Sequence, residues 1–262
     1  NQCSNIHAIG FVFAMLLLTT AAPSFAAEPE RADPLNVRDY GAVADGTTDN
    51  TAAFQKALDT AAASKLTEVV VPAGRYSFSG SLRIPKEVTL RGTYDYAPSH
   101  AGIRDKSDEK PEYGSVLSVR GDSGNDAAPA FIQLQTNAVI QGFCIYYPDQ
   151  KEDAPEPIKY PYAISMRGNN PALIDCELLN PYNGIDASQN QRALIRNVHG
   201  QPLHIGVYVN DIYDIGRIEN VHWNPWWSIN TPAYNWQMEH GVAFLFGRTD
   251  WHYVLNTFCF GY

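Results

Sequence analysis

A short unit recurs along the second half of the chain. Its copies begin with an aliphatic residue, at positions 140, 174, 195, 218 and 254. The unit is about 21–23 residues long apart from two longer insertions. A second strand-like run follows in each complete copy, at 163–165, 184–187, 206–209 and 241–244. Units this short, with Pro/Gly turns and no helix, are typical of stacked solenoid coils, whereas a propeller blade needs about 40 residues. The sequence therefore predicts an all-β fold built from the coils of a parallel β-helix.

Stacking these units predicts columns of equivalent side chains. An inward aliphatic column is expected from Ile174, Ile195, Ile218 and Val254. An inward ladder of amides at a turn, which satisfies polar groups from rung to rung, is expected from Asn197, Asn220 and Asn256. An outward column of alternating charge is expected from Asp175, Arg196 and Glu219.

One segment has a clear helical pattern. From Asp49 to Ser64 the apolar residues recur at helical spacing, in Phe54, Ala57, Leu58 and Ala61. Asp49 or Asn50 is placed to cap the first turn. The remainder of the chain after residue 67 favours strands and turns.

Two neighbouring segments, Asn36–Leu58 and Val69–Tyr76, resemble the N-terminal signature of the pectate-lyase superfamily, which is related to glycoside hydrolase family 28. In that superfamily the segment forms the first strand, a capping α-helix over the end of the solenoid, and the first coil. The resemblance implies an all-β, right-handed single-stranded parallel β-helix with such an N-terminal capping α-helix. It implies less about the chemistry, because one fold hosts many reactions.

The chain departs from the polygalacturonase pattern. Those enzymes carry Asn-Thr-Asp-Gly-x-Asp, whose first Asp is catalytic, and the nearest segment here is Pro181–Asp186, with Asn183 at that place. Only Asp186 matches an acidic position of the pattern. The resemblance therefore does not supply the standard polygalacturonase site.

The two ends of the chain carry signals of their own. An apolar run from Ile9 to Pro23 precedes small residues at 24–26, as in a secretory signal peptide. We expect residues 1–26 to be removed, residues 27–262 to form the β-helix domain, and the protein to be secreted or periplasmic. The chain stops within a repeat, so further C-terminal coils are expected.

The cysteines and the net charge restrict the classes of ligand and partner that we expect. Cys144, Cys176 and Cys259 are too few for a disulfide framework and lack metal-ligand spacing, so we expect core thiols and no metal site. The net charge of −9 argues against nucleic acid and anionic membranes as partners. The expected partner is a polysaccharide or oligosaccharide substrate. The oligomeric state is not addressed by the sequence.

The two insertions, at 149–161 and 227–240, leave the predicted coils at the same corner. They are expected to border a groove across the face that carries Ser165, Asp186 and Tyr208. The second insertion is rich in aromatic residues, which stack on sugar rings or simply pack the insertion onto the coil. Substrate binding is predicted for Tyr182, His204, Tyr208, Arg217, Trp226, Trp227 and Trp236.

Catalytic roles are predicted for Asp186, Asp211, Asp214, Glu239 and His240. Hydrolysis of a glycosidic bond needs two carboxylates roughly 5–9.5 Å apart, and ideal strands place Asp186 and Asp211 about 11 Å apart. Asp211 and Asp214 are equally compatible with turn positions. Arg217 is an ion-pair candidate or a partner for a uronate. His199 and His222 form a stacked pair or turn positions, and no catalysis is predicted for them.

The sequence thus favours a secreted glycoside hydrolase without a cofactor. A polysaccharide lyase or uronate epimerase, with calcium possible for a lyase, is the first alternative. A non-catalytic carbohydrate-binding β-helix is the second alternative.

Overall fold

The computed structural model describes residues 33–100 and 111–262. The expected signal peptide, residues 1–26, lies outside the described residues. Within the described part of the chain, no helix is both long and apolar enough to cross a membrane.

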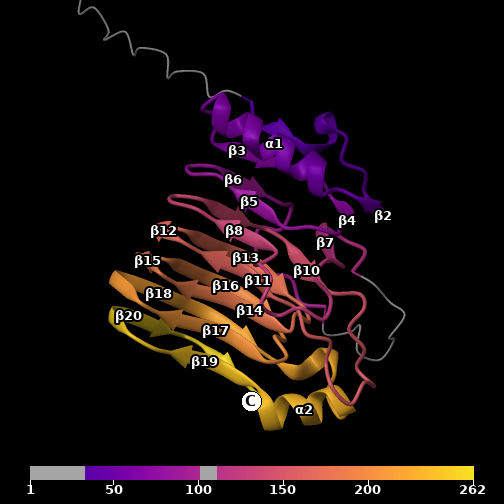
Figure 1. Ribbon diagram of the computed structural model, residues 1–262, viewed down its shortest axis with the longest axis vertical. Coiled ribbons are helices and arrows are strands. Elements are labelled where there is room, and N and C mark those ends of the chain that lie inside the picture. Colours follow the sequence, from indigo (N-terminus) through magenta and orange to yellow (C-terminus); the bar gives the residue numbers. More distant parts are fainter. Residues whose placement is uncertain (1–32, 101–110) are drawn as a thin grey trace, which may run out of the picture. The chain divides into compact units, whose positions relative to one another are not determined.

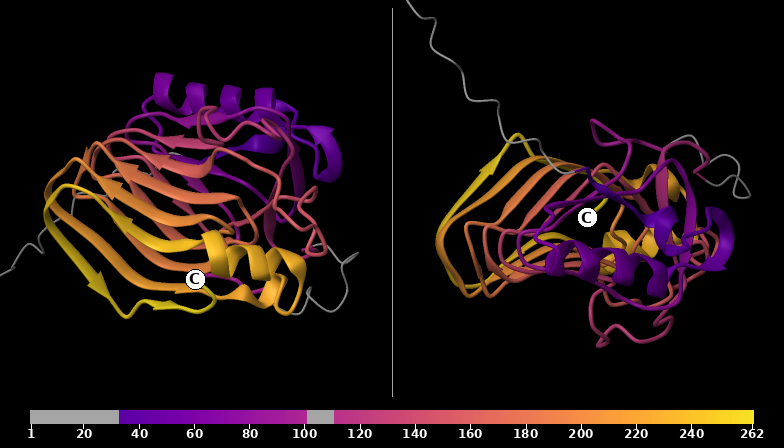
Figure 2. Two further views of the ribbon diagram at one scale, coloured as in Figure 1. Left: turned by 60° about the horizontal axis from the view of Figure 1, so that its bottom comes forward. Right: turned by 90° about the horizontal axis from the view of Figure 1, so that it is seen from above.

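The strands stack in parallel into three faces (Figures 1 and 2). Face 1 consists of β1 (Leu35–Asn36), β3 (Glu68–Val70), β6 (Thr89–Arg91), β9 (Val139–Gln141), β20 (Thr249–Leu255) and the first halves of β13 (Ala172–Leu178), β16 (Leu194–Gly200) and β18 (Ile212–Trp223). Face 2 consists of β2 (Asp45–Asp49), β4 (Gly74–Phe78), β7 (Ser115–Val119), β10 (Cys144–Tyr146), the second halves of β13, β16 and β18, and β21 (Phe258–Cys259). Face 3 consists of β5 (Leu82–Ile84), β8 (Ile132–Leu134), β11 (Tyr162–Met166), β14 (Asn183–Ser188), β17 (Ile205–Asn210) and β19 (Val242–Phe246). The predicted right-handed parallel β-helix is confirmed.

Four short elements and two α-helices complete the described chain. The short elements are β12 (Gly168–Asn169), β15 (Asn190–Gln191) and the 3-10 helices η1 (Val37–Tyr40) and η3 (Pro225–Trp227). The helices are α1 (Thr51–Ala63) and α2 (Pro232–His240). The four apolar residues predicted for α1 are all buried in the core, and Phe54 packs edge-on against Tyr76 and Phe78. The first amide of α1, that of Thr51, donates to Asp49, one of the two predicted caps.

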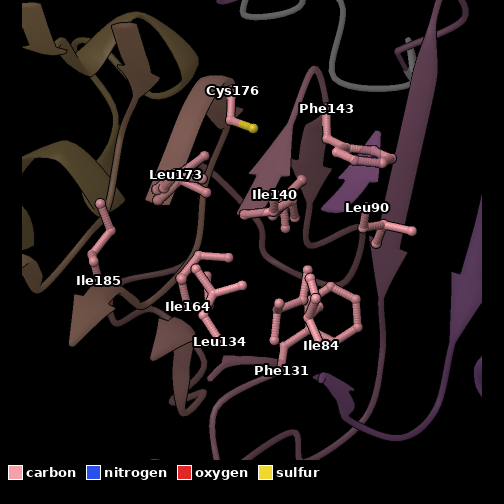
Figure 3. Close-up of a cluster of buried hydrophobic side chains, with 14 of the residues drawn as sticks. Ile84, Leu90, Phe131, Leu134, Ile140, Phe143, Ile164, Leu173, Cys176 and Ile185 are labelled. Atoms are coloured by element: carbon pink, nitrogen blue, oxygen red, sulfur yellow. The ribbon is translucent and has the colours of Figure 1, made fainter. Parts of the chain in front are cut away.

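An aliphatic column runs through the interior of the coils. Leu90, Ile140, Leu173, Ile195 and Ile218 are aligned by strand register and are all at most 1% exposed. Figure 3 shows the first three of these side chains against those of face 3. Burial of such a side chain contributes roughly 1.5–3 kcal/mol.

The coil at residue 174 is shifted by one residue from the predicted alignment. Leu173, not Ile174, occupies the inward column, and Ile174 is aligned with Arg196. Consequently Asp175 does not belong to the charged column, where only Arg196 and Glu219 are neighbours. Val254 continues the column but is 41% exposed on the last coil.

The ladder residues form the corner between faces 1 and 2. Asp175, Asn197, Asn220 and Asn256 all have φ between 52° and 54°, a left-handed conformation that Asn and Asp tolerate best. Asn197 donates to Asp175 at 2.8 Å, and Asn220 donates to Asn197 at 2.9 Å. The predicted amide ladder therefore exists, but it is not inward, because exposure rises from buried Asp175 to exposed Asn220 and Asn256.

Both insertions leave the coils at the corner between faces 2 and 3, as predicted. They connect β10 to β11 and β18 to β19, and the second contains η3 and α2 (Figure 1). Gln201 fastens the second insertion, because its buried amide donates to Ser228 Oγ and Gln237 Oε1, both at 2.6 Å. Cys144 and Cys176 are buried as predicted, Cys176 in the main core and Cys144 in a smaller apolar cluster, whereas Cys259 is exposed on the last coil.

Candidate functional site

Face 3 presents a column of polar side chains. Strand register aligns Gln133, Ser165, Asp186 and Tyr208 on four successive coils. The first three line a pocket of about 320 Å³, together with Arg83, Tyr162 and Arg167. The face predicted from the sequence to carry Ser165, Asp186 and Tyr208 is therefore a polar surface, with a pocket over β5, β8, β11 and β14.

An ion pair between Arg167 and Asp186 organises this pocket. The Asp186 side chain is only 15% exposed and also accepts the Ser188 amide at 3.0 Å. Arg167 is 38% exposed and donates to the carbonyl oxygens of Asp186 and Ser188. Asp186 is thus engaged as an acceptor, whereas the guanidinium edge of Arg167 can still pair with a ligand carboxylate.

A cluster of rings lies where the strands of face 3 begin. Tyr182 and His204 directly precede β14 and β17, and their rings stack at 4.8 Å with an interplanar angle of 26°. From α2, Trp236 lies 6.0 Å from His204, and His240 lies 4.7 Å from Trp236 between ring centroids. The ring cluster, which we define as Tyr182, His204, Trp236 and His240, contains four residues predicted from the sequence as site residues.

The imidazole of His204 is held in one orientation. Its Nδ1 lies 3.0 Å from Asn183 Oδ1, while the Asn183 amide nitrogen donates to the Tyr160 carbonyl. An amide oxygen as partner requires Nδ1 to carry the proton, which leaves Nε2 as the basic nitrogen. Asn183, which stands where polygalacturonases have a catalytic Asp, therefore positions an imidazole in this chain.

The surroundings of His204 favour its neutral form. Burial lowers its pKa below the usual 6.5, and His240 and Lys159 act in the same direction, against an opposing effect of Asp126. Burial raises the pKa of the neighbouring Tyr182, with Asp126 and Glu156 adding to the shift. At neutral pH the imidazole of His204 and the phenol of Tyr182 are therefore both neutral.

Two predicted catalytic carboxylates lie at the opposite corner, where face 3 leads into face 1. Asp211 and Asp214 follow β17 with positive φ values of 52° and 64°. Asp211 lies 3.8 Å from Arg248, and Asp214 lies 2.6 Å from Arg192. Asp211 occupies a bend before β18, whereas Asp214 lies within β18 at an irregularity of its register, and each has an arginine partner.

Other predicted site residues lie away from face 3. Arg217 is on face 1, in register with Leu194 and Tyr253, so it does not border the predicted groove. Trp226 and Trp227 lie over face 2, where Trp227 is 6% exposed in an apolar cluster. Glu239 is at the surface of α2, with 77% of its side chain exposed, 3.9 Å from His240.

A second pocket, of about 270 Å³, lies on face 2. Register aligns Glu177, His199 and His222 along its floor, and Trp226 and Trp227 border it. Glu177 is 2% exposed and accepts the His100 amide at 2.7 Å. Burial and then His222 lower the pKa of His199. Sequence reasoning missed Glu177, because the one-residue shift at residue 174 placed it outside the His199–His222 column.

Comparison with known proteins confirms the N-terminal resemblance. Residues 35–104 match the family model described as rhamnogalacturonase A/epimerase, pectate lyase-like. A 45-residue stretch is 51% identical to the mannuronan C5-epimerases AlgE5 and AlgE2 of Azotobacter vinelandii. This stretch is 17% of the chain and spans 4% of each epimerase.

Solved structures support the fold over a larger part of the chain. A Parabacteroides merdae protein that carries the provisional name glycosyl hydrolase aligns with a TM-score of 0.53 at 13% identity. The alignment covers 87% of this chain and 96% of that protein. The ORF18 protein of Geobacillus virus E2 aligns with a TM-score of 0.50 at 14% identity, over 86% of this chain and 41% of that chain.

Proposed function

We propose that the protein processes a uronate-containing polysaccharide on face 3, by removing the proton at C5 of a uronate, as a lyase or a C5-epimerase does. The observation that carries this proposal is the neutral His204, whose Nδ1 is bonded to Asn183 so that Nε2 is free to act as a base. The N-terminal match to epimerases supports the same reaction class. The predicted signal peptide agrees with a substrate outside the cell, and export is part of the proposal.

The ring cluster and the pocket lined by Arg167 bind different sugars of the polymer. Trp236 is half-buried beside His204 and offers an aromatic face to a sugar ring. Asp186, which pairs with Arg167, lies three residues beyond Asn183, or about 10 Å along β14. Arg167 therefore binds the carboxylate of a neighbouring sugar rather than that of the reacting sugar. Lys159, whose charge contributes to lowering the pKa of His204, is the cation that we assign to the reacting carboxylate.

The reaction begins with transfer of the C5 proton to Nε2 of His204, which leaves the electron pair on C5 and its carboxylate. In a lyase the C4–O4 bond then breaks, a C4–C5 double bond forms, and the leaving oxygen takes up a proton. In an epimerase a proton returns to C5 from the other side of the ring. Hydrolysis has less support, because Asp186, Asp211 and Asp214 are all paired with arginines.

The test is incubation of the purified chain with oligomannuronate, oligogalacturonate and a neutral glucan in D₂O, with calcium and with a chelator in parallel. Deuterium at C5, or an unsaturated product that absorbs in the ultraviolet, is expected with an acidic substrate. A dependence of either product on calcium would identify a cofactor of the reaction. New reducing ends without deuterium or unsaturation would replace the proposal by hydrolysis. Binding of the oligosaccharides without turnover would replace it by a carbohydrate-binding role.

A further inference from the structure

Three side chains of metal-binding type converge on the outer side of face 2. A ring nitrogen of His100, the sulfur of Cys144 and a carboxylate oxygen of Glu177 all lie within 4.8 Å of one another. They come from the connection after β6, from β10 and from β13. Because the three residues are far apart in the sequence, no motif spacing reveals them.

The location of Cys144 differs from that of an ordinary core thiol. Cys176 lies in the main core inside the coils, whereas Cys144 belongs to the smaller apolar cluster between face 2 and the second insertion. Register places Cys144 between Val116 and Glu177. A buried thiol is thus held directly beside a buried carboxylate, with Glu177 2% exposed.

A buried carboxylate and a buried thiol lie side by side in this place, with one imidazole against them. Burial raises the pKa of the Cys144 thiol well above its usual range, and Glu177 adds to the shift. Among the described residues, the ion-pair partner of Glu177 is His100, which also donates its backbone amide. Buried carboxylates are costly unless they are paired or coordinate a metal.

We propose that His100, Cys144 and Glu177 bind a zinc-class divalent cation. A thiolate and a carboxylate together carry two negative charges, which a divalent ion neutralises, while the imidazole binds as a neutral ligand. This mixed nitrogen, sulfur and oxygen set suits zinc, whereas calcium and magnesium prefer oxygen ligands alone. Binding releases the Cys144 proton to solvent and replaces the contact between His100 and Glu177.

The bound ion joins a connecting loop to the solenoid. His100 belongs to the connection between β6 and β7, and the other two ligands belong to strands of face 2. Glu177 also lines the face 2 pocket beside Ser99 and His199, so a fourth ligand reaches the ion from that side. The site is independent of the reaction proposed for face 3.

The test uses the full chain after treatment with a chelator and dialysis. Zinc is expected to bind at one ion per chain and to raise the Tm by several degrees. Cobalt(II) is expected to give a thiolate-to-metal charge-transfer band in the near ultraviolet, which reports sulfur as a ligand. Calcium at the same concentration is expected neither to bind at one ion per chain nor to raise the Tm.

Two variants and a control complete the experiment. Cys144→Ala and His100→Ala are each expected to weaken zinc binding at least tenfold, and Cys144→Ala to abolish the cobalt band. Cys176→Ala removes an equally buried thiol and is expected to bind zinc like the wild type. His100→Ala tests the site even if Cys144→Ala fails to fold, because His100 lies on a loop and is half-buried. The proposal is overturned if wild-type protein binds no stoichiometric zinc, or if both ligand variants bind it with unchanged affinity.

Discussion

Faces 2 and 3 meet at the corner where both insertions leave the coils, yet their polar groups are arranged differently. On face 3 Gln133, Ser165 and Asp186 line an open pocket, and Arg167 remains partly exposed. On face 2 Glu177 is almost fully buried under His100 and beside Cys144. The accessible groups of face 3 suit a long substrate, and the enclosed groups of face 2 suit a small cation.

The difference originates in the loops rather than in the strands. Both faces are built from parallel strands of the same coils. The connection after β6 brings His100 onto Glu177, and η3 places Trp226 and Trp227 against the pocket of face 2. On face 3 the second insertion contributes Trp236 and His240 at the strand starts. The loops therefore decide which face is covered and which is left open to a polymer.

Removal of one imidazole from each face distinguishes their roles. His204→Ala removes the proposed base and is expected to lower kcat by about 10²–10⁴-fold. His222→Ala removes a half-buried imidazole that packs against His199 and Phe258 on face 2, and kcat is expected to stay within about threefold of wild type. Steady-state kinetics on the acidic oligosaccharide checks both variants. Equal losses in the two variants would mean that face 2 takes part in the reaction.

The pH profile sharpens the assignment of His204. Its pKa is lowered mainly by burial, so the basic, neutral form persists below pH 6.5. The wild-type kcat/KM is therefore expected to hold at pH 6.5 and to fall only as the pH drops through the lowered pKa. The residual activity of His204→Ala is expected to lack this acid limb. An acid limb at or above pH 6.5 in the wild type would point to another base.

The inward-facing residues could be predicted because apolar residues recur at the spacing of the repeat. Ile195 and Ile218 occupy the inward column expected for them. The neighbouring coil was misaligned because Leu173 and Ile174 are both aliphatic, and a strand with two adjacent apolar residues does not specify its register. That slip of one residue moved Asp175 into the wrong column and concealed Glu177.

The candidate sites were predictable only where a side chain belongs to a repeat. Tyr182 and His204 stand at equivalent places in successive coils, and the structure stacks them. His100 belongs to no repeat, so nothing in the sequence places it beside Glu177. Arg167 was missed as the partner of Asp186, because it lies one residue after β11 and outside the run 163–165 that was recognised as part of the repeat.

A further test concerns the second insertion, which lies beside both faces and is held by Gln201. Gln201→Leu removes the buried amide that bonds Ser228 and Gln237, and leaves their polar atoms without these partners. A loss of about 2–3 kcal/mol is expected, which lowers the Tm by roughly 4–12 °C. Gln191→Leu, at a half-buried position on β15, is the control and is expected to change the Tm little. Thermal unfolding measures both.

This variant also separates shared from local effects. If the second insertion supports both faces, Gln201→Leu should weaken oligosaccharide turnover and zinc binding together. A Gln201→Leu variant with the Tm, turnover and zinc affinity of the wild type would show that Gln201 is not needed to hold the second insertion in place.

Trp236 and Trp226 lie on opposite sides of the corner between faces 3 and 2. Trp236→Ala removes the ring beside His204 and is expected to raise KM about 3- to 10-fold, the worth of one aromatic contact. Trp236→Phe keeps an aromatic face and should recover most of that loss, which a purely structural defect would not allow. Trp226→Ala changes a ring that is 40% exposed over face 2, and its KM is expected to stay within about twofold of wild type. Should Trp226→Ala weaken binding as much as Trp236→Ala, the polysaccharide must cross the corner, and the two faces would form one continuous binding surface.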